Sequence, residues 1–526
     1  MVPGFDSITV SLLETITIVA PYSPVNQWRL ADGSHSLITG LGGTVEQAAG
    51  YRDGRYEGDA IHAHMVYSYN LYNHINVRFV ADKDPTEPWG SGNFYGYHLM
   101  LNDIGRLERL IVGRYSLQFG QGLTLWTGLA PFNLLGSSTQ RFGKGVRLMA
   151  TFYEEGYQEG IAATLSLLRS WHATAFASKT HGTRLLGGRM EYREGNLVAG
   201  LTMHHTLLDN SISLAERVYN QDYFRGNQLF NAGVDALWQW CRLLLFGEVA
   251  IDGSGSIAAL AGANLVVDSR NSLGISYRHY DVGYQNLMAQ PYSMGDGRNE
   301  HGWTFDARTR LSLKIDALLS VDIHTFPSLR YGIYHPSSGS WLRAQLGRSV
   351  GGKFYASLRY ASRAKERNVP YSDSTVYVDE QTLKRQLQGE VKWESGSWRL
   401  ITRGAWSIFE WENGEPQRGW LVSQQVRYSA GSLQAALAYI LFDVDGYYAR
   451  IYLNESNIQY NFTMPMYYGQ GLRVYAVAKY NISRHLTLAA KYAVIHYFDR
   501  DSIGSGAAMT EGSNRQTFYL QLRLKF

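Results

Sequence analysis

The chain has 526 residues, of which 18% are charged, 13% are aromatic and a single one is cysteine. The lone Cys241 excludes an internal disulfide framework, and no apolar run reaches the roughly 18 residues of a membrane-spanning helix. The net charge of +4 excludes little, but the 37 Tyr and 13 Trp suit a protein with two membrane–water interfaces.

The first 25 residues have the periodicity of a helix. After the turn Val2-Pro3-Gly4, apolar residues recur at nearly helical spacing, namely Phe5, Ile8, Leu12, Leu13 and Ile16. No basic segment followed by an apolar segment precedes them, so we expect that an export signal was removed or that the chain is truncated. The expected domains are a helical unit over residues 1–25 and a second domain over residues 26–526.

A glycine-rich motif spans residues 113–126 and reads Gly-Arg-Tyr-Ser-Leu-Gln-Phe-Gly-Gln-Gly-Leu-Thr-Leu-Trp. Its characteristic residues are Gly120, Gln121, Gly122 and Trp126. The sequence Gly-Gln-Gly-Leu at 120–123 recurs at 469–472. Residues 122–144 show little strand alternation, and a segment of this length without strand character predicts a plug or a functional loop.

Two-residue alternation of apolar and polar side chains recurs from about Trp28 to Phe526 and predicts antiparallel strands. Residues 305–315, for example, place mostly apolar side chains at odd positions and Asp306, Arg308 and Arg310 between them. The recurrence predicts roughly 22–26 strands of about 9–12 residues, a length that suits a tilted strand in a bilayer. The predicted fold class is therefore all-β, a transmembrane antiparallel β-barrel.

Short turn signals alternate along the chain with longer polar segments. The short turns are expected at 194–196, 268–272, 351–352, 394–397 and 430–432. The longer segments are 207–228, 283–301, 364–380 and 499–514. Such asymmetry is typical of outer-membrane barrels, in which the short turns are periplasmic.

One face of these strands carries mostly cations, and in a membrane barrel the polar face lines the lumen. The predicted lumen-lining residues are Arg147, Arg308, Arg310, Arg343, Arg359, Arg473, Lys479 and Arg523. Two interpretations stay open. The cations either form a passage that favours anions, or pair with carboxylates from loops folded inside, because so wide a barrel is normally plugged.

No constellation supports catalysis, a metal or another cofactor, so we expect no enzyme activity. Gly253-Ser-Gly-Ser256 lies between two strand patterns and predicts a turn rather than a nucleophile motif. Adjacent strand residues point to opposite faces, so His204 and His205 are expected as a loop-end pair rather than a metal site. Asp296–Glu300 lacks calcium-loop spacing and is expected to be a solvated loop.

The last strand alternates strictly. Its apolar face consists of Phe518, Leu520, Leu522, Leu524 and Phe526. This strand resembles the C-terminal strand of Gram-negative outer-membrane barrels, which characteristically ends in Phe. The resemblance implies that these five residues are an assembly signal, that the chain lies in the bacterial outer membrane, and that outer-membrane lipid and the barrel assembly machinery are partners.

Two segments resemble large outer-membrane barrel proteins of Bacteroidota that carry helix-hairpin-helix repeats before the barrel. Val2-Pro3-Gly4-Phe5 looks like the hairpin of the last repeat, and residues 113–126 look like the characteristic motif of that family. Such repeats bind the DNA backbone. No Lys or Arg precedes Arg29, so nucleic acid is not expected as a partner of this fragment.

The expected function is a gated or plugged pore or transporter for polar solutes or polymers. The alternative is a structural subunit of an outer-membrane assembly or secretion complex, bound to other outer-membrane or periplasmic proteins. A weaker alternative is DNA uptake through the helix-hairpin-helix part. The fold is compatible with all of these functions and decides none of them.

Overall fold

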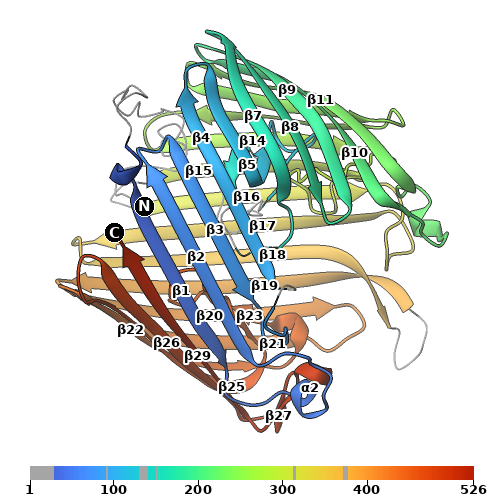
Figure 1. Cartoon of the computed structure of the whole chain (residues 1–526). Coiled ribbons are helices and arrows are strands. Elements are labelled where there is room, and N and C mark those ends of the chain that lie inside the picture. Colours follow the sequence, from blue (N-terminus) through green and yellow to red (C-terminus); the bar gives the residue numbers. More distant parts are fainter. Residues whose placement is uncertain are drawn as a thin grey trace.

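A computed structural model describes residues 29–90, 93–128, 140–149, 152, 154–311, 315–370 and 377–526 of the chain. The helical unit expected at residues 1–25 lies outside these ranges. Within them, 24 antiparallel strands form a closed barrel, which confirms the predicted fold class (Figure 1). The same residues contain no helix that is long and apolar enough to cross a membrane.

The wall strands follow one another in sequence order. They are β1 (Ser34–Thr44), β2 (Ile61–Leu71), β3 (Ile75–Lys83), β4 (Phe94–Ile104), β5 (Leu107–Gln118), β7 (Gln158–Leu168), β8 (Trp171–Thr180), β9 (Thr183–Glu194), β10 (Leu197–Ile212), β11 (Gly226–Trp240), β12 (Leu243–Asp252), β13 (Ile257–Val266), β14 (Asn271–Tyr280), β15 (Glu300–Leu311), β16 (Ile315–Phe326), β17 (Ser337–Val350), β18 (Phe354–Pro370), β19 (Tyr377–Ser395), β20 (Trp398–Trp411), β21 (Gln417–Ala430), β22 (Leu433–Val444), β25 (Gly469–Asn481), β26 (Leu486–Tyr497) and β29 (Asn514–Lys525).

Short elements lie in the connections between wall strands. The strands are β6 (Gly145–Leu148), β23 (Ile451–Tyr452), β24 (Met466–Tyr467), β27 (Ser502–Ile503) and β28 (Thr510–Glu511). The helical elements are α2 (Ala49–Arg52) and the 3-10 turns Leu30–Asp32, Val218–Asn220, Tyr447–Ala449 and Gly506–Ala508. The described part of the chain is therefore almost entirely β-structure.

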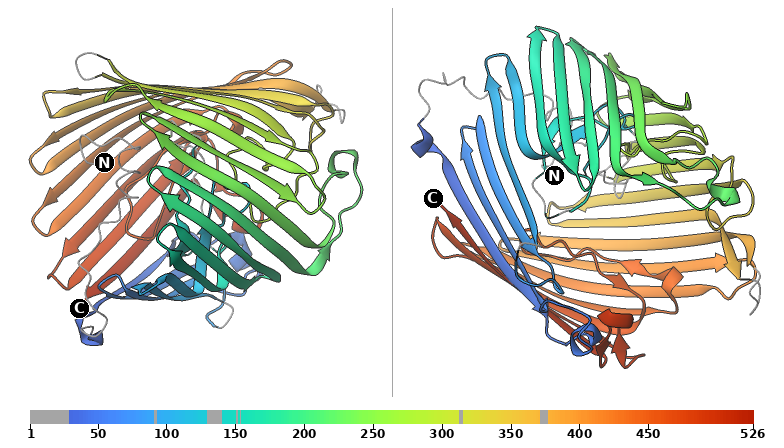
Figure 2. Two further views of the ribbon diagram at one scale, coloured as in Figure 1. Left: turned by 90° about the horizontal axis from the view of Figure 1, so that it is seen from above. Right: turned by 45° about the vertical axis from the view of Figure 1, so that its right-hand side comes forward.

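The barrel closes where the first wall strand meets the last. β1 pairs with β29 from Ser36 opposite Lys525 to Thr44 opposite Thr517. Beyond this ladder, the N–H of His35 donates to the carbonyl of Phe526 at 2.7 Å, and the two rings stack with centroids 5.1 Å apart. The views in Figure 2 show the blue strands beside the red ones, so the wall has no open edge there.

The predicted asymmetry of the connections is confirmed. All five predicted short turns join wall strands at the end of the barrel where β1 begins and β29 ends. The long connections, among them 213–225, 281–299, 445–468 and 498–513, lie at the other end. In outer-membrane barrels the short turns are periplasmic, so the long connections face the exterior.

Two details of the predicted strands are wrong. Segment 364–380 was expected as a loop, but β18 and β19 take most of it and reach 17 and 19 residues instead of about 12. Their polar ends still pair across the ladder, as Arg367 does with Glu380, because strand pairing outside the lipid needs no apolar face. The alternation at 305–315 also spans two strands, since β15 ends at Leu311 and β16 begins at Ile315.

The outer surface carries the belt that a bilayer requires. Exposed aliphatic side chains lie midway along the strands, for example Val234, Val249, Ile275, Leu358, Val422 and Leu437. Exposed aromatic residues near the short-turn end are Trp171, Trp238, Trp240, Phe354, Trp398 and Tyr480. Those nearer the long connections are Tyr95, Tyr97, Phe230, Trp303, Trp406 and Trp420. An apolar band between aromatic girdles marks a barrel of the bacterial outer membrane.

Candidate functional site in the barrel lumen

The glycine-rich motif leaves the wall and enters the lumen. Up to Tyr115, β5 pairs with β7, but its last residues pair with β6 instead. Side chains of both parities are buried from Gly113 to Gln118, and residues 121–128 are buried as well. A wall strand exposes every second side chain to lipid. We therefore place residues 114–128, the inner loop, inside the barrel.

The bend at Gly113 starts this path. Its φ of +105° is one that residues with a side chain rarely adopt. A Cβ at this position would lie 2.3 Å from the carbonyl oxygen of Tyr97 on β4. The inner loop then packs on the inner face of the neighbouring strands, where the Tyr115 hydroxyl donates to the carbonyls of Ile161 and Ala177 at 3.2 Å each.

One carboxylate holds the turn of the inner loop. Glu248 Oε2 accepts hydrogen bonds from the N–H groups of Gln121 at 2.5 Å and Leu123 at 3.1 Å. Its Oε1 accepts from the N–H of Thr124 at 2.7 Å. Gly120 and Gly122 have φ of +54° and +85°, so successive N–H groups converge into a nest for an anion. The motif residues thus shape a backbone cradle around a carboxylate of β12.

The carbonyl groups of the inner loop are bound from the opposite side. His204 Nε2 lies 2.9 Å from the Thr124 carbonyl, and Asn286 Nδ2 donates to the same oxygen at 2.7 Å. The Tyr284 hydroxyl donates to the Leu123 carbonyl at 2.8 Å, and burial raises the pKa of this phenol, which keeps the proton in place. The backbone of this turn therefore has donors and acceptors matched on both sides.

These contacts correct one expectation of the sequence analysis. His204 and His205 do not form a loop-end pair, because both lie within β10. His204 is buried on the lumen face, while His205 points the other way and is only half-buried. The expected turn at Gly253–Ser256 is confirmed between β12 and β13.

Arg141 ties the far end of the predicted plug to the inner loop. The side chain of Gln121 exchanges two hydrogen bonds with the backbone of Arg141, at 2.8 and 3.1 Å. The Arg141 guanidinium lies 5.0 Å from the centre of the Trp126 ring, and burial lowers its pKa to about 10. Residues 129–139 of the predicted plug lie outside the described ranges, so the plug as a whole stays a prediction.

A second connection also enters the lumen. The segment between β22 and β25, residues 445–468, carries Glu455, whose side chain is completely buried. Its carboxylate accepts from Arg473 Nε at 2.5 Å and from Lys491 Nζ at 2.9 Å. Burial alone would raise the pKa of the Glu455 carboxyl, but these two cations lower it below its usual range. This ion triad holds the segment against the inner wall.

A third buried charge cluster fixes the connection between β14 and β15, residues 281–299. Arg278 Nε donates to Glu300 at 2.5 Å, and its two terminal nitrogens donate to Asp322 at 2.8 and 3.0 Å. The Tyr292 hydroxyl of the connection donates to Asp322 at 3.0 Å. The solvated loop expected at Asp296–Glu300 is wrong for Glu300, which begins β15 and is fully buried.

The predicted lumen cations have different surroundings. Seven lie on the strand parity opposite the exposed apolar side chains, namely Arg308, Arg310, Arg343, Arg359, Arg473, Lys479 and Arg523. Arg147 differs, because it lies exposed on β6, which is not a wall strand and pairs with residues 115–118 of the inner loop. Arg473 pairs with Glu455, Arg310 pairs with Asp316 at 2.8 Å, and Arg359 Nε donates to the Gln345 amide at 3.1 Å.

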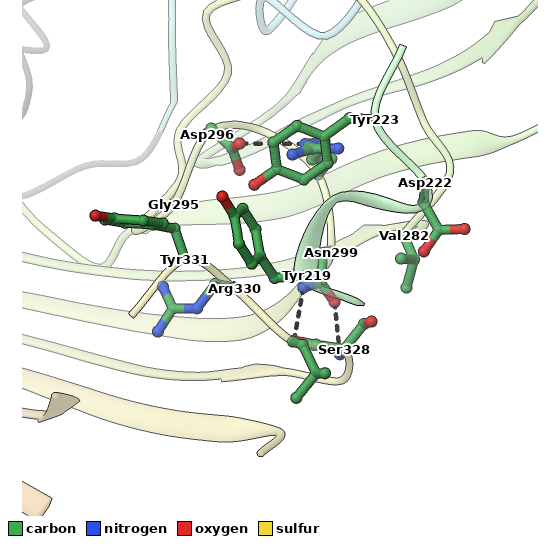
Figure 3. Close-up of a pocket in the computed structure, with 12 residues that line it drawn as sticks. Tyr219, Asp222, Tyr223, Val282, Gly295, Asp296, Asn299, Ser328, Arg330 and Tyr331 are labelled. Carbon is green, nitrogen blue, oxygen red and sulfur yellow. Dashed lines mark hydrogen bonds and ion pairs between the residues drawn. The ribbon is translucent and has the colours of Figure 1, made fainter. Parts of the chain in front are cut away.

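The outer mouth contains a pocket of about 250 Å³ between three connections (Figure 3). Tyr219 and Tyr331 meet edge to face, with ring centroids 5.5 Å apart. The Arg298 guanidinium lies 3.5 Å from the centre of the Tyr223 ring, and Arg330 lines the opposite side. Burial lowers the pKa of Arg330. Asp222 and Asp296 also line the pocket, and Arg298 Nε donates to Asp296 at 3.1 Å, so both charged signs and tyrosine rings are available to a polar ligand.

No protein-family model matches the chain, and no curated protein matches it. Among solved structures, it is similar to the ferripyoverdine receptor of the outer membrane of Pseudomonas aeruginosa, with 12% identity, a TM-score of 0.48 and coverage of 94% of this chain and 72% of that chain. The siderophore receptor PirA from Acinetobacter baumannii has 9% identity and a TM-score of 0.44, and the match covers 94% of this chain and 80% of that chain. The copper transporter OprC has 10% identity and a TM-score of 0.46, and the match covers 94% of this chain and 80% of that chain. These similarities concern the barrel fold.

Proposed function

We propose that the chain is a gated outer-membrane transporter, in which polar solutes pass through the lumen when the inner loop moves aside. The observation that carries the proposal is the cradle around Glu248. Three N–H groups of one loop converge on one wall carboxylate, so this one side chain holds the whole N–H side of the turn. Displacement of the Glu248 side chain would therefore break all three of these hydrogen bonds at once.

The solute class follows from the mouth and the wall. At the mouth, Arg330 lines a pocket of tyrosine rings and forms no ion pair with a carboxylate of the described ranges. On the lumen face, Arg359 and Lys479 likewise form none with a described carboxylate. A passage lined by cations favours anions. We therefore propose that small anionic solutes, such as sugar acids, pass more readily than neutral sugars of the same size.

The test is solute flux into liposomes that contain the purified protein. Glu248→Ala removes the acceptor of three buried N–H groups, each of which costs about 1–3 kcal/mol when left unpaired. We expect this variant to admit a sugar acid several-fold faster than wild type. Glu390→Ala is the matched control, because Glu390 is a lumen carboxylate bound to Arg403 at 2.7 Å and Lys392 at 2.8 Å on the wall alone.

The outcomes separate the alternatives. Equal flux through both variants contradicts the role of the inner loop as a gate. Absence of flux through wild type and both variants contradicts transport and favours the alternative of a structural subunit with a filled lumen. A preference for the neutral sugar contradicts the proposed solute class but leaves the gate intact.

A further inference from the structure

Three potential metal ligands meet on the lumen face of β2 and β3, apart from the anchor of the inner loop. His62 and His64 are two residues apart in β2, so both side chains point to the same face. Asp82 of β3 lies directly opposite His64 in the strand register. One ligand atom from each of the three side chains lies within 4.8 Å of the other two.

The two histidines hold buried polar atoms that lack partners within the described ranges. Only 5% of His64 and 7% of Asp82 is exposed. His62 Nε2 lies 3.0 Å from Asp82 Oδ1, which is ion-pair distance. Asp82 Oδ1 has no partner other than His62, and the Nδ1 atoms of both histidines have no hydrogen-bond partner within the described ranges. Native proteins rarely leave buried polar atoms unpaired, and one bound cation would satisfy this group together.

The surroundings hold the His64 ring in place. Gly40 of β1 is the register partner of His64, and a Cβ there would lie 2.3 Å from His64 Cε1. The Phe152 ring lies 5.2 Å from the His64 ring, and Tyr460 of the second inward connection packs edge-on against Phe152 at 5.4 Å. The Gln521 amide nitrogen lies 3.3 Å from His64 Nε2. A ligand that is fixed in this way loses little freedom on binding an ion.

The local charge favours a cation. The ammonium group of Lys83, next to Asp82 in β3, lies 2.8 Å from Asp59 and also donates to the Ile61 carbonyl at 2.8 Å, so its charge is already compensated. Asp84 places a second carboxylate oxygen 4.0 Å from His62 Nε2. Two carboxylates therefore face the histidines from β3 and the residue that follows it.

We propose that His62, His64 and Asp82 bind a divalent transition-metal ion, and that Zn²⁺ fits this ligand set best. Two imidazole nitrogens and one carboxylate oxygen suit zinc, whereas calcium and magnesium prefer oxygen ligands alone. Ligand atoms around tetrahedral zinc lie roughly 3.3 Å apart, so atoms within 4.8 Å converge through small side-chain rotations. His62 is partly exposed, and a water molecule from the lumen takes the fourth position.

The sequence contains the signal for this cluster, although the sequence analysis expected no metal site. A His-X-His pattern in a strand places both imidazoles on one face. The third ligand depends on which residue of β3 lies opposite His64, and this register is not visible in the sequence.

The test is metal binding by tag-free full-length protein in detergent, stripped with a chelator and titrated with Zn²⁺ or Co²⁺. We expect one saturable equivalent and a visible absorption band for Co²⁺. We expect each of the substitutions His62→Gln, His64→Gln and Asp82→Asn to weaken metal binding by about 100-fold or more. Mutation of residues that only hydrogen-bond to metal ligands already lowers metal affinity by about 10–100-fold. His98→Gln is the control, because His98 is a buried lumen histidine bonded to Asn76 at 3.0 Å.

Folding is checked by far-UV circular dichroism. If His64→Gln does not fold, the partly exposed His62→Gln decides the outcome. Binding that is equal in His62→Gln, His98→Gln and wild type overturns the site. Absence of saturable binding by wild type overturns it as well.

Discussion

Glu248 on β12 and Thr124 in the inner loop are joined by a hydrogen bond of 2.7 Å from the Thr124 N–H to Glu248 Oε1, although they are 124 residues apart in sequence. Around this bond, the carboxylate also accepts the N–H groups of Gln121 and Leu123. The contact links the glycine-rich motif to the wall of the barrel. It fixes the N–H side of the turn, while His204, Asn286 and Tyr284 bind its carbonyl side.

Gly120→Ala is expected to release the inner loop as Glu248→Ala does. A Cβ at Gly120 would lie 2.6 Å from Glu248 Oε2, so the carboxylate has to move away from its N–H partners. Gly431→Ala is the matched control, because Gly431 has a similar positive φ of +53° but open space around it. Conductance in planar bilayers measures the effect. Equal currents from the two alanine variants would show that backbone strain alone, and not the carboxylate, explains the change.

Acid pH is expected to release the second inward connection. The pKa of Glu455 is lowered in the folded state, so the stabilisation from this carboxyl is present above its unfolded value of about 4.3. It is lost as the pH falls through the lowered folded pKa. Protease cleavage within 445–468 should therefore increase only in strongly acidic buffer. Glu455→Gln should be cleaved already at neutral pH; identical pH profiles for the variant and wild type would contradict the role of the ion triad.

Arginine substitutions are expected to distinguish the two faces of β18. Leu358 is 48% exposed on the outer surface, and Leu358→Arg places a charge in lipid at a cost of roughly 2–4 kcal/mol near the bilayer midplane. Ser357→Arg places the charge in the lumen opposite Glu390. Denaturant unfolding in detergent or lipid measures the difference, and equal losses would contradict the face assignment. Leu520 and Gln521 on β29 also face lipid and lumen, but they are less suited to this comparison. The Gln521 amide donates to the Gln459 carbonyl at 2.6 Å, so its replacement would also break a contact with the second inward connection.

Phe526→Ala is expected to lower the outer-membrane yield of the barrel. The ring of Phe526 stacks on His35 at the closing seam, and the C-terminal strand resembles an assembly signal. Phe354→Ala is the control, because Phe354 is an exposed aromatic residue at the short-turn end of β18. The amount of each variant in the membrane fraction is compared with wild type. A yield that falls equally for both would assign the effect to the aromatic girdle and not to the seam.

Much of the barrel was predictable because alternation with a period of two fixes which face of each strand meets lipid. The number of wall strands, the side of the short turns and the parity of Arg343 or Arg473 all follow from that pattern. The ends of β18 and β19 do not, because polar strands beyond the bilayer have the same composition as loops.

The contents of the lumen were less predictable. Gly-Gln-Gly-Leu occurs twice in the chain. At 120–123 it forms the turn of the inner loop, and at 469–472 it begins the wall strand β25. The first copy is distinguished by its contacts with Glu248, Tyr284 and Arg141, and these contacts are long-range or involve irregular connections. The clusters around Arg278 and Glu455 likewise combine residues of several strands and connections, whose register and path a single sequence does not reveal.

The most direct test of the gated lumen is single-channel conductance of the intact wild-type protein beside Glu248→Ala under the same salt and voltage. We expect little or no steady current from wild type and a several-fold larger, anion-selective current from the variant. A large, steady and ungated current from wild type, unchanged in Glu248→Ala, would contradict the account and identify an open pore.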